Sequence, residues 1–273
     1  MSPKRLHQKV AAGRPRKTGP LALLVKLGLF VLVISFGVSV LFSRVERDST
    51  TLCRLDNRFL RETAILLDET DGYSRGQAAS IARYLENTLA NSLVDEKFTF
   101  YSLGPSVNSF FQDFYACNPG SEQDQSDLSP EQRIQYRDWG ADFLARLVVY
   151  VDALIDRSAA DNSPIMQMIQ YVANQNPYTN DETEKRLILV SNLIHNTAEF
   201  SHYRDTSNFG AVSGDQNLSR LLAPLSDVDV EILFVQRPQL LAIQNRSHIE
   251  SFWRPYVNAS GGRIVSVERI NLE

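Results

Sequence analysis

Oxygen-bearing side chains follow an apolar run near residue 68 in a pattern that a simple turn does not require. The segment TAILLDETDGYS runs from apolar residues directly into Asp68, with Thr70 two positions later and Gly72 beyond it. Gly72 alone would let the chain turn. Ser163, in NSPIM, and the pair 191–192, in LILVSN, are further polar positions beside apolar segments. Oxygen atoms of this kind can hold a ligand, and a carboxylate can also attack one.

The elements that must position these residues alternate between strand-like and helix-like patterns. Apolar runs typical of strands lie at 63–68, 97–104, 185–192, 227–236 and 263–270, and helical patterns lie at 74–93, 129–155, 162–175 and 246–262. This alternation predicts an α/β fold with a mostly parallel central sheet and helices on both faces. Parallel sheets place ligands at the carboxyl ends of their strands. Asp68 is therefore expected at the ligand-binding rim of the sheet.

Three short segments, LLDETDG (66–72), DNSPIM (161–166) and LILVSN (187–192), together resemble the metal-ion-dependent adhesion site of von Willebrand factor type A (vWA) domains. In that family an Asp-x-Ser-x-Ser motif, a hydroxyl residue before a central helix and an acidic residue after a hydroxyl converge on Mg²⁺. By this resemblance Asp68, Thr70, Ser163 and Asn192 occupy the metal-ligand positions. An acidic group of a partner protein would complete the coordination. The resemblance covers roughly residues 60–270.

Two residues depart from the family pattern. Gly72 stands where the second Ser of the first motif belongs, and Asn192 stands where an Asp belongs. An Asn can offer a carbonyl oxygen but no charge, and Mg²⁺ prefers hard, charged oxygen ligands. Asp71 is one place away from the position at which it could compensate. The resemblance thus implies a degenerate site, with Mg²⁺ as its possible cofactor.

Catalysis is the alternative interpretation of Asp68 and Ser191, because haloacid-dehalogenase-like phosphatases also end strands on an Asp and on a Ser or Thr. That chemistry needs a second acid two residues after the nucleophile, to protonate the leaving group. Thr70 occupies that place, and the acid Asp71 falls one residue later. No phosphate-binding loop, dinucleotide fingerprint or nucleophile elbow occurs in the sequence. We therefore expect a protein that is not an enzyme.

A membrane anchor is predicted at the N-terminus. Residues 21–43 are apolar except for Lys26, and about 20 such residues span a bilayer. Residues 1–26 hold seven Lys or Arg and no acid, leaving 21 basic against 32 acidic residues in the remainder. The positive-inside rule predicts a cytoplasmic tail at 1–20, and everything beyond a tether at 44–60 would be extracytoplasmic, or periplasmic in a bacterium. The acidic remainder argues against nucleic-acid binding. A cleaved signal peptide is the alternative for 21–43, although its apolar core is usually shorter.

The remaining features lie in the tether and in the domain at 61–273. Cys53 and Cys117 form an even pair beyond the predicted anchor, so an oxidising compartment favours a disulfide between them, with two unpaired thiols as the alternative. Residues 105–128 are polar and turn-rich, and we interpret them as an irregular insertion. His195 and His202 lack partners at zinc-site spacing, which favours a surface role or a polar contact with a partner. Three large aromatic residues, Phe252, Trp253 and Tyr256, are predicted to lie in the core.

These features favour a membrane-anchored, extracytoplasmic protein-binding module that recognises a partner at the rim of the sheet, with or without Mg²⁺. A scaffold subunit of an envelope complex, with no functional ion site, is the alternative. The two hypotheses differ at the rim. Recognition there predicts that Asp68→Ala abolishes binding, whereas a scaffold predicts losses at 105–128 or 193–210.

Overall fold

The computed structural model describes residues 24–26, 28–30, 45–121, 129–175, 183–204, 208–212, 214 and 216–271. The chain divides into two units, Met1–Val45 and Glu46–Glu273, and the fold below belongs to the second. Among the described residues, no helix combines the length and the apolar character needed to cross a membrane. The predicted anchor at 21–43 falls mostly outside the described residues.

A central sheet organises the second unit. Its strands are β1 (Arg61–Asp68), β2 (Glu96–Leu103), β3 (Phe114–Cys117), β4 (Glu184–Ser191), β5 (Val228–Val235) and β6 (Arg263–Ile270). In the described part of the chain the sheet has six strands in the order β3-β2-β1-β4-β5-β6. All neighbours pair in parallel except β3, which runs antiparallel to β2. The mixed α/β architecture and its mostly parallel sheet confirm the predicted fold class.

The edge strand β3 was not predicted. It lies inside residues 105–128, for which we expected an irregular insertion, and pairs four residues with β2. A four-residue segment carries too little periodicity to be recognised from the sequence. Its formation depends on the exposed edge of β2.

Helices connect the strands. They are α2 (Arg75–Ala90), η1 (Val107–Ser109), α3 (Pro130–Ala153), α4 (Ile165–Asn174), α5 (Phe209–Val212), α6 (Gln216–Ser219), η3 (Pro238–Leu240), η4 (His248–Trp253) and α7 (Arg254–Ala259). Ser129 begins α3 with a capping box, in which its hydroxyl accepts from the Gln132 N–H and the Gln132 side chain accepts from the Ser129 N–H. The predicted amphipathic helix at 246–262 is a π-helical turn, η4, that continues into α7.

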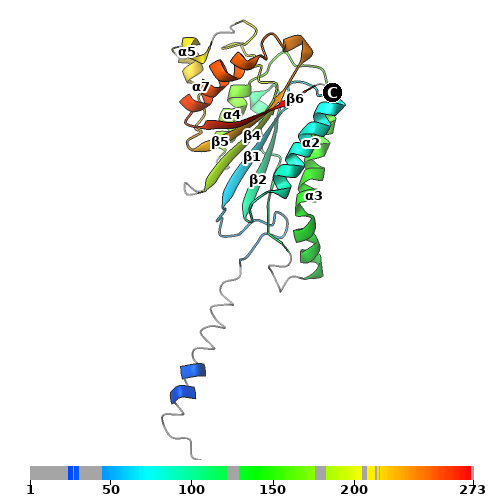
Figure 1. Cartoon of the computed structure of the whole chain (residues 1–273), viewed down its shortest axis with the longest axis vertical. Coiled ribbons are helices and arrows are strands. Elements are labelled where there is room, and N and C mark those ends of the chain that lie inside the picture. The colour runs from blue at the N-terminus through cyan, green and yellow to red at the C-terminus, as the bar shows by residue number, and fades with distance from the viewer. Residues whose placement is uncertain are drawn as a thin grey trace, which may run out of the picture. The chain divides into compact units, whose positions relative to one another are not determined.

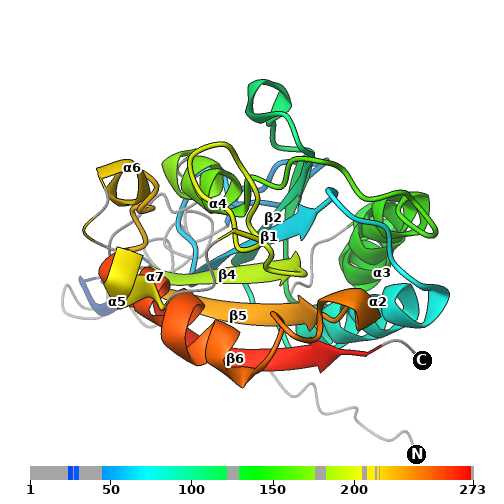
Figure 2. The same ribbon diagram turned by 90° about the horizontal axis from the view of Figure 1, so that it is seen from above.

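Helices cover both faces of the sheet (Figure 1). One face packs against α2 and α3 through residues such as Ile65, Leu67 and Val190. The other packs against α4, η4 and α7 through the alternate residues Leu66 and Leu189. Because successive side chains point to opposite faces, a strand buried on both sides appears as one continuous apolar run, as β1 does. Viewed from above, the parallel strands run side by side between these two helical layers (Figure 2).

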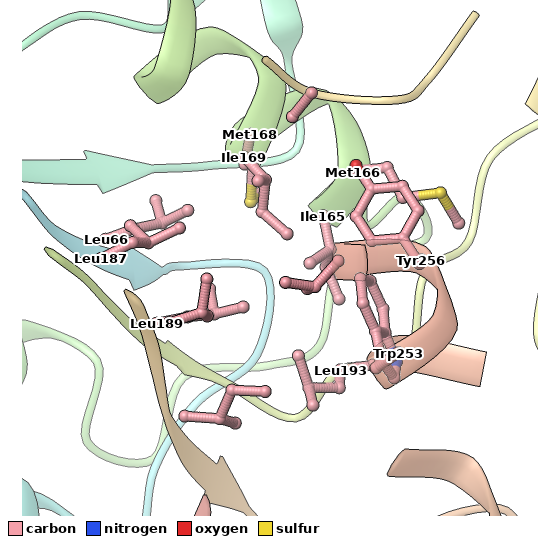
Figure 3. Close-up of a cluster of buried hydrophobic side chains, with 14 of the residues drawn as sticks. Leu66, Ile165, Met166, Met168, Ile169, Leu187, Leu189, Leu193, Trp253 and Tyr256 are labelled. Carbon is pink, nitrogen blue, oxygen red and sulfur yellow. The ribbon is translucent and has the colours of Figure 1, made fainter. Parts of the chain in front are cut away.

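Large aromatic residues from the C-terminal part of the chain fill the core on the face of the sheet that α4, η4 and α7 cover. Trp253 and Tyr256 are fully buried and lie beside Ile165 and Met166 at the start of α4 (Figure 3). Phe252 is buried with them, which confirms that these aromatic residues belong to the core. Trp253 Nε1 also donates to Leu193 O at 3.0 Å. The packing therefore fixes both the first turn of α4 and the loop that follows β4.

A disulfide and buried ion pairs close the end of the sheet where the parallel strands begin. Cys53 and Cys117 are bonded, with their Cα atoms 4.8 Å apart, which confirms the predicted pairing. Next to this bond, the buried Glu96 carboxylate accepts from Arg61 Nη2 and from Arg186 Nη2, each at 2.7 Å. The strand-start end is thus held by covalent and ionic contacts.

Candidate binding site

The carboxyl ends of β1 and β4 place a buried carboxylate among hydroxyl groups. Asp68, the last residue of β1, is 2% exposed. Its Oδ1 accepts from the Thr70 N–H at 2.9 Å and from Thr70 Oγ1 at 2.7 Å. Its Oδ2 accepts from Ser191 Oγ at 2.7 Å, from the end of β4. Both carboxylate oxygens of Asp68 are therefore already hydrogen-bonded within the domain.

Ser163 extends this network to a third segment of the chain. Its Oγ lies 2.9 Å from Thr70 Oγ1, and since the Thr70 hydroxyl proton is directed to Asp68, Ser163 is the donor. Ser163 directly precedes Pro164 and α4, and its backbone exchanges hydrogen bonds with Asn196 at 2.8 and 2.9 Å. The loops after β1, before α4 and after β4 are thus joined at one rim. The structure brings Asp68, Thr70 and Ser163 together as the sequence predicted.

Asn192 lies beside this cluster but is directed elsewhere. Its Oδ1 accepts from the Ile194 N–H at 2.7 Å, and its Nδ2 donates to Asp71 Oδ2. The side-chain oxygen that could have ligated a cation is therefore used to form the turn after β4. Asp71, which could have supplied a second charge, is bonded to Asn192 and not to the Asp68 cluster.

Gly72 is required by a close approach of two segments. A Cβ atom at this position would lie 2.1 Å from Arg157 O. The neighbouring backbone bonds explain this contact: the Ala160 N–H donates to Thr70 O at 2.7 Å, and the Tyr73 N–H donates to Leu154 O at 2.8 Å. The adhesion motif carries a Ser at this position. Here the space for its side chain is occupied by the backbone of the segment that leads from α3 to α4.

Burial controls the charges at this rim. Removal from water raises the pKa of Asp68, the hydrogen bonds from Thr70 and Ser191 oppose that rise, and the neighbouring charge of Asp71 adds to it. Burial also raises the pKa of Asp71, against the attraction of Arg237 and the bond from Asn192. No basic side chain is hydrogen-bonded to Asp68 among the residues that the structure describes.

These residues do not fit a divalent cation. One carboxylate, Asp68, already accepts three hydrogen bonds, and the oxygen of Asn192 faces a backbone N–H. Within the described residues, no group of three or more His, Cys, Asp or Glu side chains is arranged to hold a metal ion. Mg²⁺ at this site stays a prediction of the sequence resemblance.

The histidines of the loop after β4 are buried, so the predicted surface role for them is wrong. His195 is fully buried, and its Nδ1 accepts from the Met166 N–H at 3.2 Å. His202 is 1% exposed, and its Nδ1 accepts from the His195 N–H at 3.0 Å. The His202 ring lies 4.6 Å from that of His248, between ring centres. Phe200 of the same loop and Phe252 of η4 pack against His202, with ring centres 5.1 and 4.4 Å away.

Two further residues at the rim were not identified from the sequence. Gln244 Nε2 donates to Asn192 O at 2.8 Å and to Val235 O at 3.0 Å, which joins the ends of β4 and β5. Tyr73 donates its hydroxyl to Asp68 O at 2.7 Å. Neither stands in a motif, because each acts through a contact with a distant backbone carbonyl.

Comparisons with known proteins give structural neighbours only. No family model matches the sequence, and no curated protein matches it. The VWA domain of SpRpn10 is 13% identical, with 78% of this chain and 89% of that chain covered and a TM-score of 0.39. BatB from Bacteroides thetaiotaomicron is 10% identical, with 78% and 91% covered and a TM-score of 0.40. The pilus adhesin SpaC from Lactobacillus rhamnosus GG is 8% identical, with 79% and 28% covered and a TM-score of 0.44.

The TM-scores are all below 0.5, so the neighbours carry no conclusion about what the chain binds. The class of molecule defined by the structure itself is a mixed α/β domain with a closed polar cluster at the carboxyl ends of β1 and β4.

Proposed function

We propose that this chain is a protein-binding module that recognises a partner protein at the rim formed by the carboxyl ends of its strands. The observation that supports this proposal most is the hydrogen-bonded cluster of Asp68, Thr70, Ser163 and Ser191. It fixes three loops against one another, so that the surface above them is preorganised. A preorganised surface loses less conformational entropy on binding.

Recognition by this rim is independent of a divalent cation in our proposal. The donors around Asp68 are neutral hydroxyl and amide groups that complete its hydrogen bonding. A Mg²⁺ ion would have to displace them and would find no second free carboxylate, because Asp71 is bonded to Asn192. The cluster therefore acts as a structural bracket for the loops.

Binding is favoured over catalysis by the same geometry. A carboxylate nucleophile must reach its substrate with a free oxygen, together with an acid for the leaving group. Asp68 is 2% exposed and both of its oxygens accept hydrogen bonds. Thr70, at the place of the leaving-group acid, donates its own proton to Asp68.

We further propose that residues 21–43 anchor the protein in a membrane and that the domain is extracytoplasmic. The Cys53–Cys117 bond supports this location, because disulfides form and persist in oxidising compartments. In a bacterium that compartment is the periplasm.

A scaffold role is the second candidate, and a specific surface favours it. Phe111 and Val107, in the segment between β2 and β3, are 57% and 48% exposed. Aromatic residues are enriched at protein interfaces, and both side chains belong to one short exposed segment. In this alternative the partner contacts the segment 105–113. The other region expected for a scaffold, 193–210, belongs to the loop after β4, so a contact there counts as recognition at the rim.

Site-specific photo-crosslinking in the full-length, membrane-embedded protein distinguishes these candidates. A photoreactive amino acid replaces Tyr203, which is 54% exposed in the loop after β4, or Phe111, or Val94, which is 46% exposed before β2. Rim recognition predicts one discrete adduct from position 203 and none from position 94, the control at the opposite end. An adduct from position 111 alone supports the scaffold role. Absence of an adduct at position 203 contradicts the proposed function.

A further inference from the structure

Arg237 lies two residues beyond β5, at the same rim, with a fixed backbone. Its N–H donates to Gln244 Oε1 at 2.7 Å, and Gln244 Nε2 donates in turn to Asn192 O. The backbone of Arg237 is therefore tied to the turn that follows β4. Its side chain has no comparable restraint.

The Arg237 guanidinium makes no hydrogen bond or ion pair with any residue that the structure describes. Its Nε and Nη2 are closed off from solvent without a partner, although the residue as a whole is only half-buried. The nearest aromatic contact is Tyr73, whose ring centre lies 5.5 Å from Cζ. An unpaired donor on a charged group, removed from water, is costly.

Nε and Nη2 form the edge of the guanidinium that binds a carboxylate with two parallel hydrogen bonds. This chain uses that edge repeatedly. Arg54 donates from Nε and Nη2 to the two oxygens of Asp56 at 2.8 and 2.7 Å. The same pairing occurs between Arg137 and Asp138, Arg254 and Glu250, and Arg263 and Asp229. In Arg237 the equivalent edge has no acceptor.

Two acids whose charges act on Tyr73, the ring over which Arg237 lies, are already bonded to other groups. Asp71 feels the positive charge of Arg237, which opposes the rise of its pKa on burial, but its carboxylate accepts from Asn192. Glu69 accepts from Ser102 and lies 3.5 Å from Arg157, between side-chain atoms. A carboxylate from outside the domain would therefore not displace an internal partner of Arg237.

We propose that Arg237 binds the carboxylate of an Asp or Glu side chain on the partner protein, without a metal ion. The guanidinium turns outward from its covered position, and its Nε/Nη2 edge donates both hydrogen bonds to the two carboxylate oxygens. A carboxylate is favoured over a phosphate, because the neighbouring charge of Asp71 repels a dianion more strongly. This inference rests on the proposed rim recognition and adds its chemical specificity.

A direct test uses the full-length protein in detergent with ¹⁵N-labelled arginine and EDTA present. N-acetyl-aspartate methylamide is added up to about 100 mM, a range suited to one weak contact. We expect the Arg237 Nε–H resonance to shift, N-acetyl-asparagine methylamide to leave it in place, and Arg237→Gln to remove it. Equal responses to the two amides, no response to either, or a larger response to inorganic phosphate would overturn the inference.

Crosslinking from position 203 separates this inference from the proposed function. We expect Arg237→Gln to reduce the adduct by roughly tenfold or more, as for loss of a bidentate charge contact. Arg237→Lys keeps the charge but not the fork and should restore only part of the yield. The matched control, Arg263→Gln, removes an exposed arginine from β6 and should leave the yield unchanged. A full adduct with Arg237→Gln contradicts the role of Arg237 and leaves rim recognition standing.

Discussion

The two ends of the central sheet each bury a carboxylate, but they neutralise it differently. Glu96, where β2 begins, is bonded to the guanidinium groups of Arg61 and Arg186. Asp68, where β1 ends, is bonded only to hydroxyl and amide donors. The nearby cation at that end, Arg237, has no hydrogen-bonded partner among the described residues. One end of the domain completes its charges internally, and the other retains a cation for a ligand.

The pKa values of the two acids follow this difference. Burial by itself raises the pKa of Glu96, but the bond from Arg61 and the charge of Arg186 bring it below the usual value. Burial raises the pKa of Asp68, and its neutral donors do not reverse that rise. Loss of one partner from a buried ion pair is strongly destabilising, whereas charged groups without a partner are typical of functional sites. We therefore assign structure to the strand-start end and binding to the rim.

The largest effect is expected from breaking the ionic cluster. Glu96→Ala leaves two partly buried guanidinium groups without their main acceptor and should lower the free energy of unfolding by about 3–5 kcal/mol. The matched control is Asp229→Ala, which removes an exposed pair with Arg263 and should cost about 0–1 kcal/mol. Urea unfolding measures both. Similar losses for the two variants would remove the distinction on which the comparison rests.

Acid pH should weaken the rim side of the domain through its histidines. Burial lowers the pKa of His195 to about 3 and also lowers the pKa values of His202 and His248. The unfolded chain binds these protons first, so the stabilisation is complete above about pH 6.5 and is lost as the pH falls. Each histidine contributes a slope of about 1.4 kcal/mol per pH unit in that window.

His202→Asn tests this slope, since an amide oxygen can still accept from the His195 N–H. Unfolding free energies between about pH 7 and pH 5 should fall less steeply in the variant than in the wild type, by about one histidine's share. Identical slopes would mean that His202 is not protonated on unfolding in this range. Glu96→Gln serves as the control, because the lowered pKa of Glu96, at the other end of the sheet, places its titration below this pH range.

Neutral substitutions of Asp68 and of Glu96 should change the free energy of unfolding with opposite dependences on pH. The raised pKa of Asp68 gives a contribution that is present below its unfolded value and is lost as the pH rises. The lowered pKa of Glu96 gives a contribution that is present above its unfolded value and is lost as the pH falls.

The free energy of unfolding of Asp68→Asn, relative to the wild type, should therefore be higher at pH 7 than at pH 4. For Glu96→Gln the same difference should be lower at pH 7 than at pH 4. We expect a change of about 1 kcal/mol for Asp68→Asn, the scale of one altered hydrogen bond. Chemical denaturation at the two pH values measures both trends. Trends of the same sign would show that the two carboxylates share one kind of environment.

The sequence predicted the elements that local patterns specify. Strand β1 is a continuous apolar run because both of its faces are covered, and its end at Asp68 followed from that pattern. The meeting of Asp68, Thr70 and Ser163 followed from the geometry of a parallel sheet. The first of these predictions needed only periodicity and chain order, and the second also used the resemblance to the adhesion-site motif.

The remaining features depend on contacts between distant segments. Gly72 is required by the backbone of Arg157, which no local pattern announces. His202 is buried because His248 and Phe252 pack against it from another element. Arg237 looks like an ordinary polar residue in the sequence, and only the absence of a described partner for its guanidinium distinguishes it. Such features arise from the tertiary packing.

The smallest expected effect concerns Mg²⁺. In the wild type, melting temperatures in EDTA and in millimolar Mg²⁺ should coincide, because Asn192 and Asp68 already have internal partners. Asn192→Asp puts a second carboxylate next to Asp71, so repulsion should lower stability in EDTA. If Mg²⁺ then binds, an ion at ten times its dissociation constant restores about 1.4 kcal/mol.

The control for this measurement is Asn258→Asp, an equal charge change at an exposed position in α7, which should show no response to Mg²⁺. A rise in the melting temperature of the wild type with Mg²⁺ would contradict the cation-independent rim. It would also remove the contrast between the two ends of the sheet, because an ion would then neutralise Asp68 as arginines neutralise Glu96. If only Asn192→Asp responds to Mg²⁺, the amide of Asn192 alone accounts for the absence of an ion site in the wild type. Arg237 then remains the cation at the rim.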